Sequence, residues 1–198
     1  MKDFTAIEEL FEKAESGKYK EWIIKDPTVE YLANNSWDWV KFNEGERIVI
    51  HWDGNGVDYK AESERDLKSA LGFTFFSESA KDMFKLLFKN KGTYLYGIYV
   101  CRAYNPHNEF CFETFELEDV KVDGAYLPRE GVENVARAFG LDNAPVLGHG
   151  TLKQAVLYVK AHPGTNVVCR PSHEMQNEKG ERVIVRVMYD GFKLQDET

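Results

Sequence analysis

Apolar and polar residues alternate along two stretches that flank a glycine turn near residue 45. Such alternation predicts two half-buried strands. The segment Asp53–Gly56, which reads DGNG, is a strong hairpin signal, so a third strand is expected from Val57 to Tyr59. The alternating apolar positions of the first two strands are Trp37, Trp39, Ile48, Ile50 and Trp52.

Other stretches carry apolar residues at the spacing of a helix face. A stop at Gly140 and a cap at Thr151 mark two of these helices. The intervening strands are rich in aromatic and β-branched residues, and residues 110–122 read either as a strand pair or as one long bent strand. The predicted helices span residues 4–14, 27–34, 77–88, 128–140 and a stretch after Thr151, and the other strands span 93–100, 110–122, 166–169 and 182–188.

This order of elements predicts the α+β class, with antiparallel sheets and flanking helices in a single domain over residues 1–198. The net charge of −8 argues against a broad basic surface for nucleic acid, although not against a local basic groove. No apolar run approaches the roughly 20 residues that span a bilayer, and the acidic N-terminal pattern differs from a signal peptide. We therefore expect a soluble, cytoplasmic protein without membrane contact.

The cysteines and histidines show no spacing typical of metal ligands, so we expect no metal site. Cys101 and Cys111 would pair only if they fell on neighbouring strands, and free thiols in a reducing cytosol are the favoured reading. The GHGT segment, Gly148–Thr151, lacks the pattern of a phosphate loop and is read as the turn and N-cap of a helix. Phe73, Phe75 and Phe76 form either an exposed patch or, the favoured reading, packing under the neighbouring helix.

Long segments of the sequence, in order, resemble the adenylyltransferase domain of the ATP-dependent RNA ligase family, especially its compact phage-type members. The likeness covers nearly the whole chain and implies the nucleotidyltransferase fold of RNA and DNA ligases. It also suggests a phage-encoded protein that works in the cytoplasm of a host cell. The segments that carry it are EYLANNSW, IVIHWDG, YLYG, LEDVKVDGAYLPREGVENVARAFGL, APVLGHGTLKQAV, VVCRP and KGERVIVRV.

In this family the lysine of a Lys-x-Asp-Gly motif attacks the α-phosphate of ATP and forms a lysine–AMP bond. When the chain is aligned through IHWDG, the aspartate and glycine of the motif fall on Glu44 and Gly45. The motif's lysine then falls on Phe42. Lys41 lies one residue earlier, so strand alternation places it on the opposite face unless a bulge re-aims it.

Further family positions carry residues that cannot perform the family's chemistry. Ile98 aligns with the family glutamate that follows YG, binds ribose and helps to organise metal. Thr165 aligns with the glutamate of a second metal-binding motif. Arg186 and Met188 align with the two lysines of the family's final Lys-x-Lys motif, which contact phosphates. Magnesium needs oxygen ligands and phosphate transfer needs placed cations, so the resemblance implies lost catalysis.

Charge has also changed around the nucleotide pocket that the resemblance implies. Glu118 aligns with the aromatic residue that packs on adenine in the family. Glu62 aligns with an arginine that follows the WDG hairpin in the family. Both add negative charge beside a polyphosphate. Arg170 and Arg186 align near former phosphate contacts, where they would either attract an anion or, the favoured reading, pair with carboxylates. We therefore expect no catalytic residue and no cofactor, with ATP and Mg²⁺ retained only if the chain is an active ligase.

Our leading interpretation is a catalytically inactive, ligase-like protein that binds a protein partner, as an adaptor in phage replication or by interfering with a host factor. A second is nucleic-acid binding without catalysis, along the cluster Lys81, Lys85, Lys89 and Lys91. A third is an active RNA ligase with Lys41 as a relocated nucleophile. A fourth is a different small ligand in a pocket made more apolar by Phe42, Ile98 and Met188. The sequence leaves the oligomeric state open.

Overall fold

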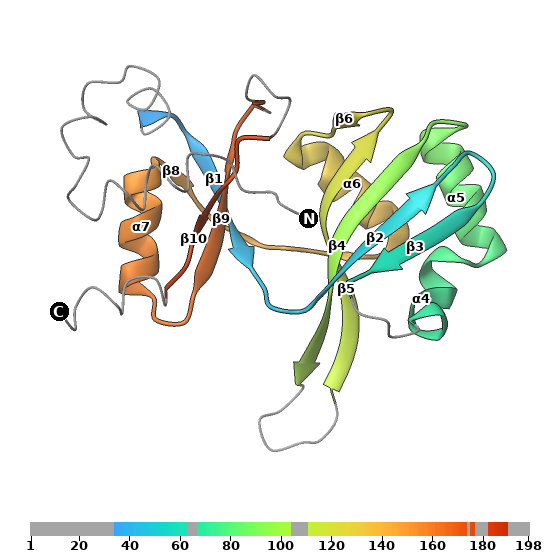
Figure 1. The fold of residues 1–198 in the computed structure, drawn as a ribbon, viewed down its shortest axis with the longest axis horizontal. Helices are drawn as coiled ribbons and strands as arrows, with labels where there is room; N and C mark the ends of the chain where they lie inside the picture. The colour runs from blue at the N-terminus through green and yellow to red at the C-terminus, as the bar shows by residue number, and fades with distance from the viewer. Residues whose placement is uncertain (1–33, 63–66, 104–110, 174, 177–181, 190–198) are drawn as a thin grey trace. The chain divides into compact units, whose positions relative to one another are not determined.

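The computed structural model describes residues 34–62, 67–103, 111–173, 175–176 and 182–189 (Figure 1). The chain divides into two compact units. The first unit comprises Met1–Phe42 and Pro145–Thr198, and the second comprises Asn43–Ala144. The helices predicted over residues 4–14 and, but for Asn34, over 27–34 lie outside the described residues. The prediction of a single domain stays a prediction.

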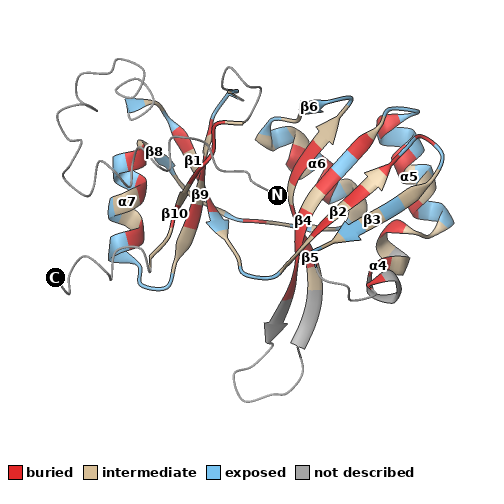
Figure 2. Ribbon diagram, viewed as in Figure 1, coloured by how far each residue is buried: buried red, intermediate tan, exposed pale blue. Residues whose placement is uncertain are grey.

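The first unit contains a four-stranded antiparallel sheet in the order β10-β9-β1-β8. Helix α7 packs on one face of it, and Figure 2 shows the buried positions of α7 on the side toward the sheet. The Thr151 hydroxyl accepts a hydrogen bond from the backbone N–H of Gln154, whose side chain bonds back to the Thr151 N–H, so the predicted cap is a full capping box. The bounds are β1 (Trp37–Phe42), β8 (Val146–Gly150), α7 (Leu152–Ala161), β9 (Asn166–Pro171) and β10 (Val185–Val187).

The second unit contains a larger sheet in the order β3-β2-β4-β5-β6, and β7 pairs in parallel with β5. Its long strands β4 and β5 pair along their length, with an irregularity between Tyr96 and Gly97. The bounds are β2 (Glu46–Trp52), β3 (Val57–Ala61), β4 (Thr93–Ala103), β5 (Cys111–Val122), β6 (Ala125–Tyr126) and β7 (Asp142–Asn143).

Three helices cover one face of the larger sheet, namely α4 (Lys68–Phe75), α5 (Glu78–Phe88) and α6 (Arg129–Phe139). Their apolar residues pack on alternate residues of β2, β4 and β5 to form the core of this unit. The buried residues that meet there include Ile48, Ile50, Trp52, Phe75, Phe84, Leu95, Leu117, Val132 and Ala136.

The α+β class is confirmed, and so are most of the predicted elements. Residues 111–122 form one long strand rather than a pair. The sequence reading missed α4 because its apolar residues do not form a narrow stripe, and it read Gly148–Gly150 as a turn although these residues belong to β8. The predicted strand over 182–188 is shorter, Val185–Val187. No helix among the described residues has the length and apolar character needed to cross a membrane.

Two local predictions from the pattern are confirmed. Phe75 is fully buried and Phe76 packs against the same core, while the side chain of Phe73 lies outside the described part. In the hairpin after β2, the Asp53 carboxylate accepts hydrogen bonds from the backbone N–H groups of Gly56 and Asn55. These bonds favour the charged form and hold the pKa of Asp53 below its ordinary value.

Candidate functional site

The two faces of β1 separate Lys41 from Phe42. Residues directly opposite each other in antiparallel strands share a face, and Lys41 lies opposite Val167, which is buried in the core under α7. Phe42 lies opposite Asn166 and therefore on the other face. A register shift after Trp39 affects the pairing of β1 with β8, whereas the pairing with β9 runs without interruption through Phe42. The bulge therefore does not bring Lys41 to the face of Phe42, and its side chain is exposed.

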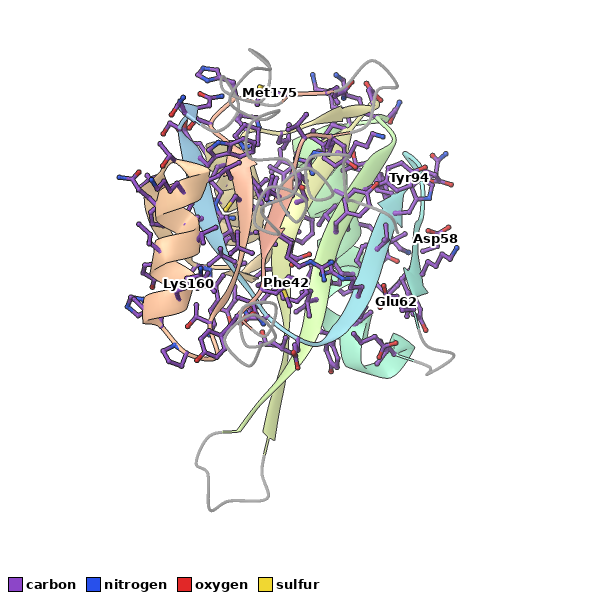
Figure 3. All side chains as sticks on the ribbon, turned by 60° about the vertical axis from the view of Figure 1, so that its left-hand side comes forward. Phe42, Asp58, Glu62, Tyr94, Lys160 and Met175 are labelled. Carbon is purple, nitrogen blue, oxygen red and sulfur yellow. The ribbon has the colours of Figure 1, made fainter. Side chains whose placement is uncertain are left out.

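Phe42 shares its face with both arginines that the sequence placed near former phosphate contacts. The guanidinium carbon of Arg186 lies 4.7 Å from the centroid of the Phe42 ring, a cation–π arrangement (Figure 3 marks Phe42). Arg170 lies opposite Asp38 on the same face. Asp38 in turn contacts Nδ1 of His149 through its Oδ1 at 2.6 Å. This face of the sheet of the first unit thus joins an aromatic ring to cationic side chains, with no amine at the position of Phe42.

The remaining predicted positions of the first unit lie near the strand ends. Thr165 directly precedes β9, and its backbone N–H donates to the carbonyl oxygen of His162 at 3.0 Å. Met188 directly follows β10, and both side chains are partly buried. A threonine hydroxyl and a thioether are poor replacements for the carboxylate and the lysine that the family uses at these positions.

Ile98 packs closely against the turn at Glu44 and Gly45. A Cβ added to Gly45 would lie 2.4 Å from Cγ2 of Ile98 and 2.6 Å from the carbonyl oxygen of Tyr99, so only glycine fits this approach. Ile98 is buried, whereas Glu44 points to solvent. The position where the family has a metal-organising glutamate therefore serves packing.

A second contact fixes the start of the same turn. Nδ2 of Asn43 donates to Oε2 of Glu116 at 2.5 Å, and Glu116 is 1% exposed. Glu116 lies directly opposite Ile98 in the sheet, so the buried carboxylate and the buried isoleucine are neighbours on β5 and β4. The sequence reading named neither Asn43 nor Glu116, because nothing local indicates that residues so far apart in the chain would meet.

Glu118 has a cationic partner that the sequence reading also missed. Arg47 on β2 reaches across β4 and places a guanidinium nitrogen 3.1 Å from a carboxylate oxygen of Glu118. The negative charge predicted at this position is thus compensated within the second unit. The backbone N–H of Glu62 donates to the carbonyl oxygen of Arg47, while its side chain is exposed.

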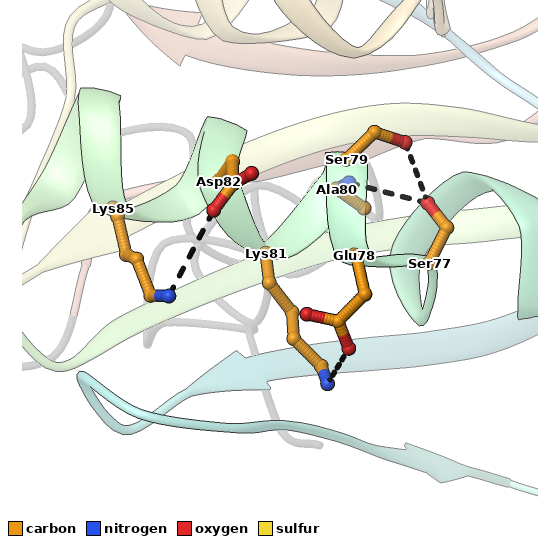
Figure 4. A network of polar contacts seen from close by, with 7 residues as sticks. All are labelled: Ser77, Glu78, Ser79, Ala80, Lys81, Asp82 and Lys85. Carbon is orange, nitrogen blue, oxygen red and sulfur yellow. Dashed lines mark hydrogen bonds and ion pairs between the residues drawn. The ribbon is translucent and has the colours of Figure 1, made fainter.

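The predicted lysine cluster on α5 carries compensating carboxylates (Figure 4). The ammonium of Lys81 lies 2.6 Å from Glu78, and that of Lys85 lies 3.8 Å from Asp82. The hydrogen bond from Lys81 lowers the pKa of Glu78. Beyond the helix, Lys91 lies 3.4 Å from Asp123, and Lys89 is the C-terminal cap residue. Three of the four lysines therefore have a carboxylate nearby, which is typical of a solvated helix face.

The described cysteine side chain and the side chains that could bind a metal provide no further candidate site. Burial raises the pKa of the Cys169 thiol to about 12, so the thiolate is disfavoured. The side chains of Cys101 and Cys111 lie outside the described part. Within the described ranges, no three His, Cys, Asp or Glu side chains converge in a way that would hold a metal ion.

Solved structures with a similar fold include RNA ligases. Naegleria gruberi RNA ligase, solved with pyrophosphate, superposes with a TM-score of 0.59 at 12% identity and covers 86% of this chain. Structures of the same enzyme with ATP and Mn give the same TM-score at 11% identity and cover 86% or 85% of this chain. An archaeal ATP-dependent RNA ligase superposes with a TM-score of 0.56 at 15% identity and covers 84%.

These likenesses show the fold, which is the nucleotidyltransferase fold of ATP-dependent RNA ligases, as the resemblance predicted. The chain spans about half the length of these enzymes, 54% of the Naegleria ligase and 46% of the archaeal one. No protein-family model and no curated protein matches the sequence.

Proposed function

We propose that this chain is a catalytically inactive relative of the ATP-dependent RNA ligases that acts by binding a protein partner. The observation that carries the proposal lies at the end of β1. There Arg186 covers the ring of Phe42 on one face, and Lys41 is exposed on the other. Attack on the α-phosphate of ATP needs an amine at the position of Phe42, and an aromatic hydrocarbon ring supplies no nucleophile.

The second unit supports the same proposal by independent changes. Ile98 is buried and packs on Gly45, so it offers neither an oxygen ligand to a metal nor a hydrogen-bond acceptor to a ribose. Glu118 occupies the position of the adenine-stacking ring and is held by Arg47. Loss of a single contact to the transition state typically costs about 3 kcal/mol, and the expected losses here are several.

The test of lost catalysis is self-adenylylation. The full chain is incubated with ATP labelled at the α-phosphate, with Mg²⁺ or Mn²⁺, and the protein is separated under denaturing conditions. We expect no label on this chain, whereas an active ATP-dependent RNA ligase in the same reaction becomes labelled. A label that survives denaturation and disappears in Lys41→Ala would establish the relocated-nucleophile alternative in place of ours.

The proposed protein partner raises the questions of where the protein acts and which surface it uses. Because the sequence resembles phage-type members, we propose a phage-encoded protein in the cytoplasm of its host, where it acts on a host factor or as an adaptor in replication. Two leucines on α5 support a protein-binding surface, since Leu86 is 74% exposed and Leu87 is 39% exposed. The ion pairs of Lys81, Lys85 and Lys91 weigh against this helix as a nucleic-acid edge.

Affinity capture from host cells tests this surface when the same capture is made with two matched variants. We expect Leu86→Glu to lose the captured partner, because a charge at the centre of an apolar contact costs about 2 kcal/mol or more. Leu157→Glu changes a 57% exposed leucine on α7 and should retain the partner. Equal retention by both variants would exclude α5 as the contact surface, and the absence of any specific partner would contradict protein binding altogether.

A further inference from the structure

The face of the larger sheet that is turned away from the helices carries a row of aromatic rings. His51, Tyr94, Lys121 and Tyr126 lie directly opposite one another across β2, β4, β5 and β6. Tyr96 stands two residues along β4 on the same face. We call these five residues the tyrosine face; Figure 3 marks Tyr94 and also Asp58, which lies opposite His51 on β3. Residues on the opposite face of the same strands, such as Ile50 and Leu95, are buried under the helices.

The rings of the tyrosine face contact one another in sequence. The ring centroids of His51 and Tyr94 lie 4.4 Å apart and nearly parallel, and those of Tyr94 and Tyr96 lie 6.3 Å apart. Tyr96 and Tyr126 follow at 5.9 Å. Cross-strand aromatic pairs stabilise a sheet, which explains why such rings are tolerated there. Sheet stability does not require the exposure of Tyr94, which is 38% exposed and is among the few large hydrophobic side chains on the described surface.

The lysines beside these rings differ from those of α5. The ammonium of Lys121 lies 5.2 Å from the centroid of the Tyr126 ring. Lys60 on β3 lies in the next cross-strand row, beyond Val49 and Tyr96. Among the described residues, no carboxylate comes within 4.0 Å of either ammonium, whereas Lys81, Lys85 and Lys91 each have one.

The two acidic residues of this face differ in exposure, since the side chain of Asp58 is 76% exposed. Oδ1 of Asp58 lies 3.3 Å from Nδ1 of His51. Asp119 is 4% exposed, and its carboxylate accepts the N–H of Val120. Asp58 on β3 thus keeps an exposed carboxylate, while Lys60 and Lys121 bring two ammonium groups to the rows of Tyr96 and Tyr94. Exposed aromatic rings bordered by cations are complementary to a ligand that carries flat bases and phosphates together.

We propose that the tyrosine face binds single-stranded nucleic acid, with unpaired bases stacking at Tyr94 and its neighbouring rings and with Lys60 and Lys121 contacting phosphates. A duplex is disfavoured because its bases are already stacked and its grooves hide their faces. The tyrosine face lies on the same side of the larger sheet as Ile98, with Tyr96 two residues away along β4, and the proposal holds whether or not the chain has lost catalysis. Its failure would leave the adenylylation experiment unaffected.

The experiment uses the full chain and a fluorescently labelled single-stranded oligonucleotide of about 12 residues, with binding followed by anisotropy at low salt. We expect Tyr94→Ala to weaken binding roughly 5- to 150-fold, which corresponds to the loss of one stacked base. Tyr94→Phe keeps the ring and should keep most of the affinity. Lys121→Met should reduce the slope of log affinity against log salt by about 0.7, the contribution of one phosphate contact to a single strand.

Lys85→Ala on α5 is the matched control, because it removes a lysine that is already paired, and it should bind as the unchanged chain does. Circular dichroism confirms that each variant is folded. The proposal is overturned if the oligonucleotide does not bind, if the duplex form binds equally well, or if Lys85→Ala weakens binding as much as Lys121→Met does. Loss of a captured protein partner in Tyr94→Ala, without oligonucleotide binding, would instead assign the face to a protein.

Discussion

Replacing Trp52 by alanine is expected to lower the free energy of unfolding of the second unit by about 3–5 kcal/mol. The side chain is fully buried, and its ring stacks on Phe84 with centroids 5.4 Å apart. Its indole N–H donates to the carbonyl oxygen of Lys89 at 3.0 Å. Alanine would leave a cavity between β2 and α5 and remove the donor from a partly buried carbonyl. Urea unfolding followed by far-ultraviolet circular dichroism measures the change.

Two variants separate packing from the hydrogen bond. Trp52→Phe keeps a ring that can stack on Phe84 and loses the donor, so it should cost less than Trp52→Ala. Leu86→Ala removes an exposed side chain from the same helix and should change stability by no more than about 0.5 kcal/mol. If Trp52→Ala cost as little as Leu86→Ala, the assignment of Trp52 to the core of this unit would be wrong.

Elements whose ends carry local signals could be predicted from the sequence. Ser77 accepts from the N–H of Ala80 at the start of α5, and Gly140 adopts a left-handed conformation, φ 64°, at the end of α6. Both signals act within one turn of the chain, so they are visible without knowledge of the fold. Helix α4 lacks them, since the side chain of Leu67 makes no capping hydrogen bond. Its position depends on burial of Leu71 and Phe75, which only the tertiary structure provides.

The candidate site likewise combines features that local sequence predicts with features that depend on the tertiary structure. The opposite faces of Lys41 and Phe42 follow from strand alternation over two adjacent residues, and the register with β9 confirms them. The placement of Arg186 over Phe42 requires the strand order β10-β9-β1, which no local pattern specifies. The contacts between Arg47 and Glu118 and between Asn43 and Glu116 likewise join residues about seventy positions apart. The sequence therefore predicts the opposite faces of Lys41 and Phe42, but not the contacts that Arg186, Arg47 and Asn43 make.

The glycine of the YLYG segment shows how part of the resemblance is explained by packing alone. A Cβ on Gly97 would lie 2.3 Å from Cζ of Phe115 and 2.5 Å from the carbonyl oxygen of Glu116. The glycine is thus required by the close approach of β4 and β5, at the irregularity in their pairing. The next residue, Ile98, is constrained by a different contact because its side chain packs on Gly45. Packing therefore accounts for both Gly97 and Ile98, whether or not the chain has lost catalysis.

Gly97→Ala is accordingly expected to destabilise the second unit by about 1–3 kcal/mol or more, since an added methyl group in a closely packed site forces neighbours to move. The ring of Phe115 can shift, but the carbonyl oxygen of Glu116 belongs to the paired backbone of β5. Adding Phe115→Leu to Gly97→Ala should therefore recover only part of the loss, as measured by urea unfolding of both variants beside Phe115→Leu alone.

Gly92→Ala provides the control from the same region, directly before β4. A Cβ at Gly92 meets no atom within 4 Å, so this variant should unfold within about 0.5 kcal/mol of the unchanged chain. Full recovery in the double variant would show that the ring of Phe115, rather than the strand backbone, makes glycine necessary. Equal costs for Gly97→Ala and Gly92→Ala would remove the steric explanation and leave the retained glycine to be explained by function. The expected result, a large cost at Gly97 and almost none at Gly92, places the constraint on the pairing of β4 with β5.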